Sequence, residues 1–108
     1  MVTSLDKTFE ALASGPRRQI LAYLSDAELT TSELAERFSM SAPAISRHLS
    51  VLENAGLVAS ERRGQFVYYR LNSDSLVNSL SGFMFELCPV ASPLKKESRA
   101  IAKKRKTT

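Results

Sequence analysis

Apolar side chains recur every three or four positions through the first half of the chain, which is the spacing of helices with one buried face. In the first such stretch, Leu5, Phe9 and Leu12 share one side. The pattern predicts four helices, over residues 4–13, 15–25, 31–38 and 42–55. A last helix is expected over residues 74–87, with a broad apolar stripe made of Leu76, Val77, Leu80, Phe83, Met84 and Leu87.

Between the fourth helix and the last one, the apolar period changes from about 3.6 to 2. Residues 57–62 and 65–71 therefore predict two antiparallel strands that meet at Arg63-Gly64. Pro89 and Pro93 follow the last helix, and we expect regular structure to end there. The fold expected is mainly α with a two-stranded hairpin, in the order α-α-α-α-β-β-α.

Local signals mark how the third and fourth helices begin. Thr30-Thr31-Ser32-Glu33 has the form of a capping box, in which the Thr30 hydroxyl and the Glu33 carboxylate each accept from the other residue's amide. Ser41 is suited to cap the fourth helix, and Gly56 to end it. Ser39-Met40 leaves room only for a tight turn, so the two helices must cross steeply. This arrangement is a helix-turn-helix, and the hairpin after it is a wing.

The fourth helix has one apolar side and one side that carries no acidic residue before its last turn. Ile45, Leu49 and Leu52 form the apolar stripe. The opposite side carries Pro43, Ser46, Arg47, Ser50 and Asn54. A surface that is small and polar, with one guanidinium, fits a major groove about 12 Å wide. A Ser-rich surface helix is the plainer interpretation, but the helix-turn-helix context favours a DNA recognition helix, with a basic wing tip beside it.

Composition and charge narrow the class of protein. The chain has 108 residues and 44% hydrophobic residues, enough for one domain, expected over residues 1–90. No apolar run approaches the length of a membrane span, which predicts a soluble, cytoplasmic protein with no membrane partner. Of the net charge of +4, residues 95–106 supply seven bases against one acid. We expect residues 91–108 to be a flexible basic tail, with a non-specific DNA clamp as its functional alternative.

The order of elements resembles the ArsR family of small winged-helix repressors over about residues 5–87. Residues 11–21, 46–58 and 63–69 are similar to that family's second helix, recognition helix and wing, although Ser14-Gly15-Pro16 departs from the family's Asp-Pro-Thr. The resemblance implies a dimer built by the first and last helices, which here carry Leu5, Phe9, Leu12, Leu76, Leu80, Phe83, Met84 and Leu87. Together with the residue pattern, it predicts DNA contacts by Ser41, Ala42, Pro43, Ser46, Arg47, Ser50, Arg17, Arg62, Arg63 and Gln65.

Departures from the family pattern favour a member that does not sense metals, and residues 64–72 together with the apolar last helix resemble the family's autorepressor branch. Metal-sensing members carry Cys-x-Cys where this chain has Thr30-Thr31-Ser32-Glu33, or an Asp/His/His/Glu set where the last helix offers only Asp74 and Glu86. We therefore expect no metal and no cofactor. The function predicted is that of a dimeric repressor of its own operon that binds a palindromic operator in double-stranded DNA; no small-molecule inducer can be derived.

The remaining residues bear on three other functions: a redox sensor, an enzyme and a protein-binding module. Cys88 is the single cysteine, so it excludes an internal disulfide, and a thiol-redox sensor across a dimer axis is less expected than inert packing. His48 is the single histidine and is expected to pack at the edge of the apolar stripe or to touch a phosphate. With one candidate base and no glycine-rich elbow before any serine, the chain is not expected to be an enzyme. A winged helix that binds a protein remains the alternative to one that binds DNA.

Overall fold

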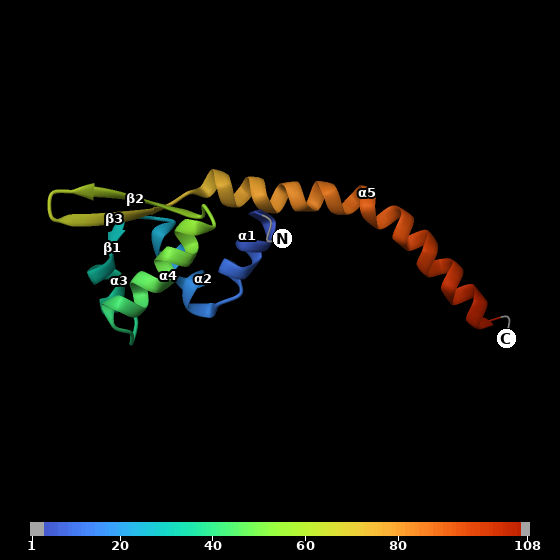
Figure 1. Ribbon diagram of the computed structural model, residues 1–108, viewed down its shortest axis with the longest axis horizontal. Helices are drawn as coiled ribbons and strands as arrows, with labels where there is room; N and C mark the ends of the chain where they lie inside the picture. The colour runs from blue at the N-terminus through green and yellow to red at the C-terminus, as the bar shows by residue number, and fades with distance from the viewer. Residues whose placement is uncertain (1–3, 107–108) are drawn as a thin grey trace. The chain divides into compact units, whose positions relative to one another are not determined.

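The computed structural model of the protein describes residues 4–106, apart from the side chains of residues 86, 88–92 and 106. Its elements follow in the order shown in Figure 1: α1 (Ser4–Leu12), α2 (Gly15–Leu24), β1 (Leu29–Thr30), α3 (Thr31–Arg37), α4 (Ala42–Asn54), β2 (Val58–Arg63), β3 (Phe66–Leu71) and α5 (Ser73–Lys106). The chain forms two compact units, which divide between Val77 and Asn78. The winged helix-turn-helix fold predicted from the sequence is confirmed in the first unit, with the first four helices within one residue of their expected ends.

The first unit is built around apolar side chains from α1 to α4 and the start of β2. Leu34, Ile45 and Leu49 are fully buried in it, so α3 and α4 pack directly on the same cluster. The cluster as a whole contains Ala11, Ile20, Leu21, Leu24, Leu34, Ile45, Leu49, Leu52, Leu57 and Val58. Burial of this apolar surface fixes α4 in rotation about its own axis and leaves its other side in solvent.

The sheet has three strands, not the two predicted from the sequence. Strand β1 pairs antiparallel with β3, placing Leu29 opposite Tyr69 and Thr30 opposite Tyr68, so the order is β1-β3-β2. A strand of two residues is too short to show an alternating pattern, which is why the sequence did not predict it. The capping box at Thr30 is confirmed, since its amide donates to Glu33 Oε1 at 2.9 Å and its Oγ1 accepts from the Glu33 amide at 3.2 Å.

The hairpin turn lies one residue later than predicted. Arg63 pairs with Phe66, so the turn consists of Gly64 and Gln65 rather than Arg63 and Gly64. Gly64 has a φ of 63°, while Gln65 does not have a positive φ. A glycine at the first of two turn positions is the requirement of a type II′ hairpin, and this requirement sets the register. In Figure 1 the hairpin extends beyond the helices of the first unit.

Helix α5 does not end near residue 87, as the two prolines predicted, but continues to Lys106. Proline inside a helix costs about 3 kcal/mol and removes one amide donor. Residues 94–106 are mostly alanine, lysine, arginine and glutamate, which have high helix propensity and favour continuation of the helix. Whether residues 91–108 move as a flexible tail stays a prediction.

Candidate nucleic-acid interface

The start of α4 is held by its cap. Ser41 precedes the helix in an extended conformation, and its hydroxyl accepts from the Ala44 amide at 3.3 Å. Pro43 occupies the first turn, where its missing amide proton breaks no helical hydrogen bond. Ser41, Ala42 and Pro43 are all exposed. The cap therefore places these three predicted contact residues at the solvent-facing N-terminal end of α4.

Further along α4, burial decides which side chains point outward. Ile45, Leu49 and Leu52 are fully buried, whereas Ser46, Arg47 and Ser50 are exposed. The outward surface from Ser41 to Ser50 thus has one positive charge and no acid. This surface, made of Ser41, Ala42, Pro43, Ser46, Arg47 and Ser50, is called the α4 face below.

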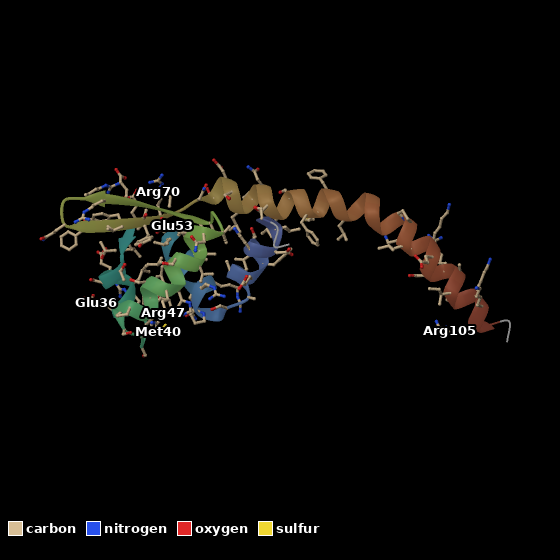
Figure 2. All side chains as sticks on the ribbon, viewed as in Figure 1. Glu36, Met40, Arg47, Glu53, Arg70 and Arg105 are labelled. Atoms are coloured by element: carbon tan, nitrogen blue, oxygen red, sulfur yellow. The ribbon has the colours of Figure 1, made fainter. Side chains whose placement is uncertain are left out.

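Arg47 is the one charged side chain of the α4 face. Within residues 4–106 as described, no hydrogen bond or ion pair engages its guanidinium. Figure 2 shows Arg47 in the part of the helix-turn-helix where Met40 lies, while Glu53 lies at the opposite end of α4, toward the sheet. Glu53 accepts a hydrogen bond from the Ser60 hydroxyl at 2.6 Å. The acid in the last turn of α4 is thereby tied to β2 and is set apart from Arg47.

Arg17, which was predicted to contact DNA, is engaged inside the molecule. Its Nε donates to the carbonyl oxygen of Ala11 at 2.8 Å, and its Nη2 to that of Glu10 at 2.9 Å. Arg18 Nη1 donates to the Leu12 carbonyl at 2.7 Å. The two arginines therefore satisfy three of the last carbonyls of α1, which have no partner within that helix. This geometry favours a structural role for Arg17, and its contact with DNA stays a prediction.

His48 is half-buried on α4 and lies against Arg17. The distance from its Nδ1 to Arg17 Nη1 is 3.4 Å. Burial lowers the pKa of His48, and the positive charges of Arg17 and Arg47 lower it further. A neutral imidazole with its proton on Nε2 leaves Nδ1 free to accept from the arginine. His48 therefore lies at the edge of the buried stripe, where one of the two sequence-based alternatives put it.

The three predicted wing residues differ in how far they are engaged. Arg63 Nη2 lies 2.8 Å from Glu28 Oε2 and 2.9 Å from Glu61 Oε2, and its guanidinium stacks 5.0 Å from the centre of the Tyr68 ring. The hydrogen bond to Glu61 raises the pKa of Arg63.

Among the residues that the structure describes, Arg62 makes one long hydrogen bond, at 3.3 Å, to the Gly64 carbonyl. Gln65 is exposed in the turn. Arg62 is therefore the more available cation at the wing tip.

The residues predicted to form a dimer are divided between the two units. In the first unit, Leu12 and Leu76 pack against the core, Leu5 is half-buried and Phe9 is 41% exposed. In the second unit, Leu80 and Phe83 are half-buried, while Met84 and Leu87 are 66% and 48% exposed. Large apolar side chains of α5 thus remain in solvent in the isolated chain.

The described residues contain no group of three or more His, Cys, Asp or Glu side chains that could hold a metal ion. The side chain of Cys88 lies outside the described part, so its predicted redox role has no structural account. None of the helices within residues 4–106 is both long enough and apolar enough to span a membrane.

Sequence reasoning missed the capping of α1 by Arg17 and Arg18. The signal for it was present, because two arginines follow the end of a short helix by only a few residues, where side chains can fold back onto its carbonyls. It also missed the ion pair between Arg63 and Glu28. The two residues are far apart in the chain, and they meet because β1, which directly follows Glu28, joins the same sheet as β2, which ends at Arg63.

Two helices joined by a short turn and followed by a β-hairpin, with a cationic and acid-free face on the second helix, define a winged helix-turn-helix protein of the DNA-binding class. The family model described as bacterial regulatory protein, arsR family, matches residues 14–60. The transcriptional repressor SdpR of Bacillus subtilis is 38% identical over 77 residues, which make up 71% of this chain and 86% of that protein. The chain belongs to the ArsR family and is a DNA-binding transcription regulator, which is not an enzyme.

Solved structures agree with this assignment. A possible transcriptional regulator for arsenical resistance is 37% identical with a TM-score of 0.68, and the match covers 75% of this chain and 84% of that one. The homodimeric winged helix-turn-helix DNA-binding domain of a possible ArsR-family regulator from Mycobacterium bovis is 28% identical with a TM-score of 0.64, over 88% of this chain and 83% of that one.

Proposed function

We propose that the protein is a homodimeric repressor that binds a palindromic operator at its own promoter and does so independently of metal ions. The observation that carries this proposal is the α4 face, which includes no acidic side chain and on which Arg47 has no partner within the described residues. A guanidinium on such a face is suited to donate to guanine O6 and N7 or to a phosphate. The wing adds sequence-independent contacts through Arg62, Arg63 and Gln65.

Two observations support a dimer. The Mycobacterium bovis domain is homodimeric, and Met84 and Leu87 on α5 are both exposed large apolar side chains. Exposed apolar side chains of this size are commonly covered by a partner. A two-fold pair would present its α4 helices to major grooves about 34–36 Å apart, which is one turn of DNA. The palindromic operator follows from that symmetry.

Repression is supported by the similarity to SdpR, which is a transcriptional repressor. The test is capture of genomic fragments by the purified protein, followed by footprinting on the promoter of its own gene. Protection of two half-sites one turn apart is expected there. Specific binding only at other promoters would reject autorepression, and protection of one half-site by a monomer would reject the dimer.

The role of the α4 face is tested with Arg47→Ala and with Lys7→Ala, an exposed cation on α1, as the matched control. Arg47→Ala is expected to weaken binding to the operator by about 1–3 kcal/mol and to relax base preference at one position per half-site. Lys7→Ala is expected to leave base preference unchanged. Equal preference in wild type and Arg47→Ala would contradict the assignment of α4 as the reading helix.

Metal independence rests on the donor set. Thr30-Thr31-Ser32-Glu33 offers no thiolate, and soft ions need several converging cysteines. Operator affinity, followed by fluorescence anisotropy, is expected to be the same with EDTA, zinc, copper, nickel or arsenite. A tenfold loss with any metal would overturn this part of the proposal. The alternative, a thiol-redox sensor, predicts a different result: operator affinity would fall with peroxide, and this fall would disappear in Cys88→Ser.

A further inference from the structure

The second half of α5 carries a row of basic side chains on one side of the helix. Lys95, Lys96, Arg99 and Lys103 are exposed and helical. At about 100° per residue they fall within an arc of about 100°, and at 1.5 Å per residue they extend over about 12 Å. These four residues are called the basic stripe. The single acid of this segment, Glu97, projects from a different side of the helix by the same geometry.

The like charges of the basic stripe destabilise the helix that carries them. Lys95 and Arg99, and Arg99 and Lys103, are like charges four residues apart, a spacing that destabilises a helix. A helix that keeps such a row gains stability when a polyanion neutralises it. Duplex DNA carries one negative charge per about 1.7 Å of its axis, and binding of each cation releases a condensed counterion. The partner with the best matched chemistry is therefore a regular row of phosphates.

We propose that the basic stripe binds the phosphate backbone of duplex DNA, as a contact separate from the α4 face and the wing. The inference rests on DNA binding by the chain, which its family membership shows. Because the stripe is joined covalently to a DNA-binding unit, its own contact with DNA becomes intramolecular and gains from a high effective concentration. The stripe adds affinity for any sequence and leaves base preference to α4.

Two other partners fit the segment less well. A helix that lies on a membrane needs a broad apolar side, often with aromatic residues, and residues 94–106 offer only Leu94 and Ile101 as large apolar side chains. A second copy of the same segment would bring like charges together unless the two stripes faced apart. Duplex DNA needs no apolar side and benefits from every cation in the row.

The experiment uses the full chain with all four stripe residues replaced by glutamine, which has similar helix propensity. Binding to a non-specific duplex is measured by fluorescence anisotropy at several salt concentrations between about 50 and 200 mM. The slope of log K against log salt is expected to become shallower by about 0.9 for each phosphate that the variant no longer neutralises. Circular dichroism verifies that α5 remains helical in the variant.

Two further sets of substitutions distinguish the effect of the position of the stripe charges from the effect of net charge alone. Lys95→Arg/Lys96→Arg/Lys103→Arg keeps every charge and is expected to keep the wild-type slope. Lys104→Gln/Arg105→Gln removes two charges that lie off the stripe and is expected to change the slope by less than Lys95→Gln/Arg99→Gln, which removes two charges from it.

An unchanged slope in the four-residue variant would overturn the proposal. So would equal changes of slope in the two double variants, because net charge alone would then explain the effect. A further overturning result is unaltered DNA binding together with abolished binding to vesicles of anionic phospholipid. The ratio of operator to non-specific affinity reports on the α4 face instead, so failure of the proposed operator function is visible separately from failure of the stripe.

Discussion

Arg17 Nη1 lies 3.4 Å from His48 Nδ1, and the same guanidinium donates to the carbonyl oxygens of Glu10 and Ala11. One side chain of α2 thus joins the C-terminal end of α1 to the middle of α4. The angular position of α4 is set by its buried leucines and isoleucine, and this polar link adds a fixed point on the side of the helix beside Arg47. Substitutions at Arg17 or His48 therefore test how firmly the α4 face is supported.

The first prediction concerns pH. Because the pKa of His48 is lowered in the folded chain, the unfolded chain takes up a proton first as the pH falls below about 6.5. The free energy of unfolding is expected to decrease between about pH 7 and pH 5.5, above the range in which most carboxylates titrate. Urea unfolding at fixed protein concentration measures it. In His48→Gln this decrease should be smaller; an identical pH dependence in both proteins would contradict the argument.

The second prediction concerns the cap of α1. Arg17→Gln is expected to lower the free energy of unfolding by about 1–2 kcal/mol, because the Ala11 carbonyl and His48 lose their donor and the Glu10 carbonyl keeps only the Ala13 amide. Arg18→Gln, the matched control, loses one exposed hydrogen bond to Leu12 and is expected to cost less than about 1 kcal/mol. Urea unfolding of both variants gives the comparison. A cost for Arg18→Gln equal to that for Arg17→Gln would show that the link to α4 adds nothing.

The third prediction separates the two wing arginines. Arg63 must give up its ion pairs with Glu28 and Glu61 before it can meet a phosphate, whereas Arg62 gives up one long hydrogen bond. Arg62→Ala is therefore expected to weaken binding to all sequences more than Arg63→Ala, with a salt slope shallower by about 0.9. Anisotropy titrations on operator and unrelated DNA measure this. The reverse order, or a change in base preference, would contradict the prediction.

The fourth prediction concerns the wing turn. Gly64→Ala places a Cβ in open space, yet the φ of 63° strains any residue other than glycine, so a cost of about 1–2 kcal/mol is expected. Gly82 in α5 also has open space but no positive φ, and Gly82→Ala is expected to stabilise its helix by about 1 kcal/mol. Urea unfolding and helical ellipticity follow the two variants. Effects of the same sign would reject the conformational explanation.

The helices of the first unit were predictable because the signals for each one, its capping residues and the spacing of its apolar residues, lie within its own segment of the sequence. In α4, Ser41, Gly56 and the spacing of Ile45, Leu49 and Leu52 mark both ends and the buried side without reference to the rest of the chain. The same holds for the capping box at Thr30. The candidate α4 face followed directly from this periodicity.

What escaped prediction depends on contacts between distant segments or on a balance of free energies. Strand β1 exists because β3 pairs with Leu29 and Thr30, and two residues show no period. The engagement of Arg17 and Arg63 depends on where α1 and Glu28 lie in space. The length of α5 reflects competition between the cost of Pro89 and the helix propensity of the residues after it, and the position of a proline alone does not decide that competition.

Thr30 ends the strand that pairs with β3 and also caps α3. Movement of β3 away from α3 at this residue would break a ladder pairing and a helix cap together, and the hydrogen bond from Ser60 to Glu53 also ties β2 to α4. Thr30 thus takes part both in the pairing with the wing strand β3 and in the start of α3. A regulator built in this way is expected to change its hold on DNA by moving the whole first unit, not by flexing the wing alone.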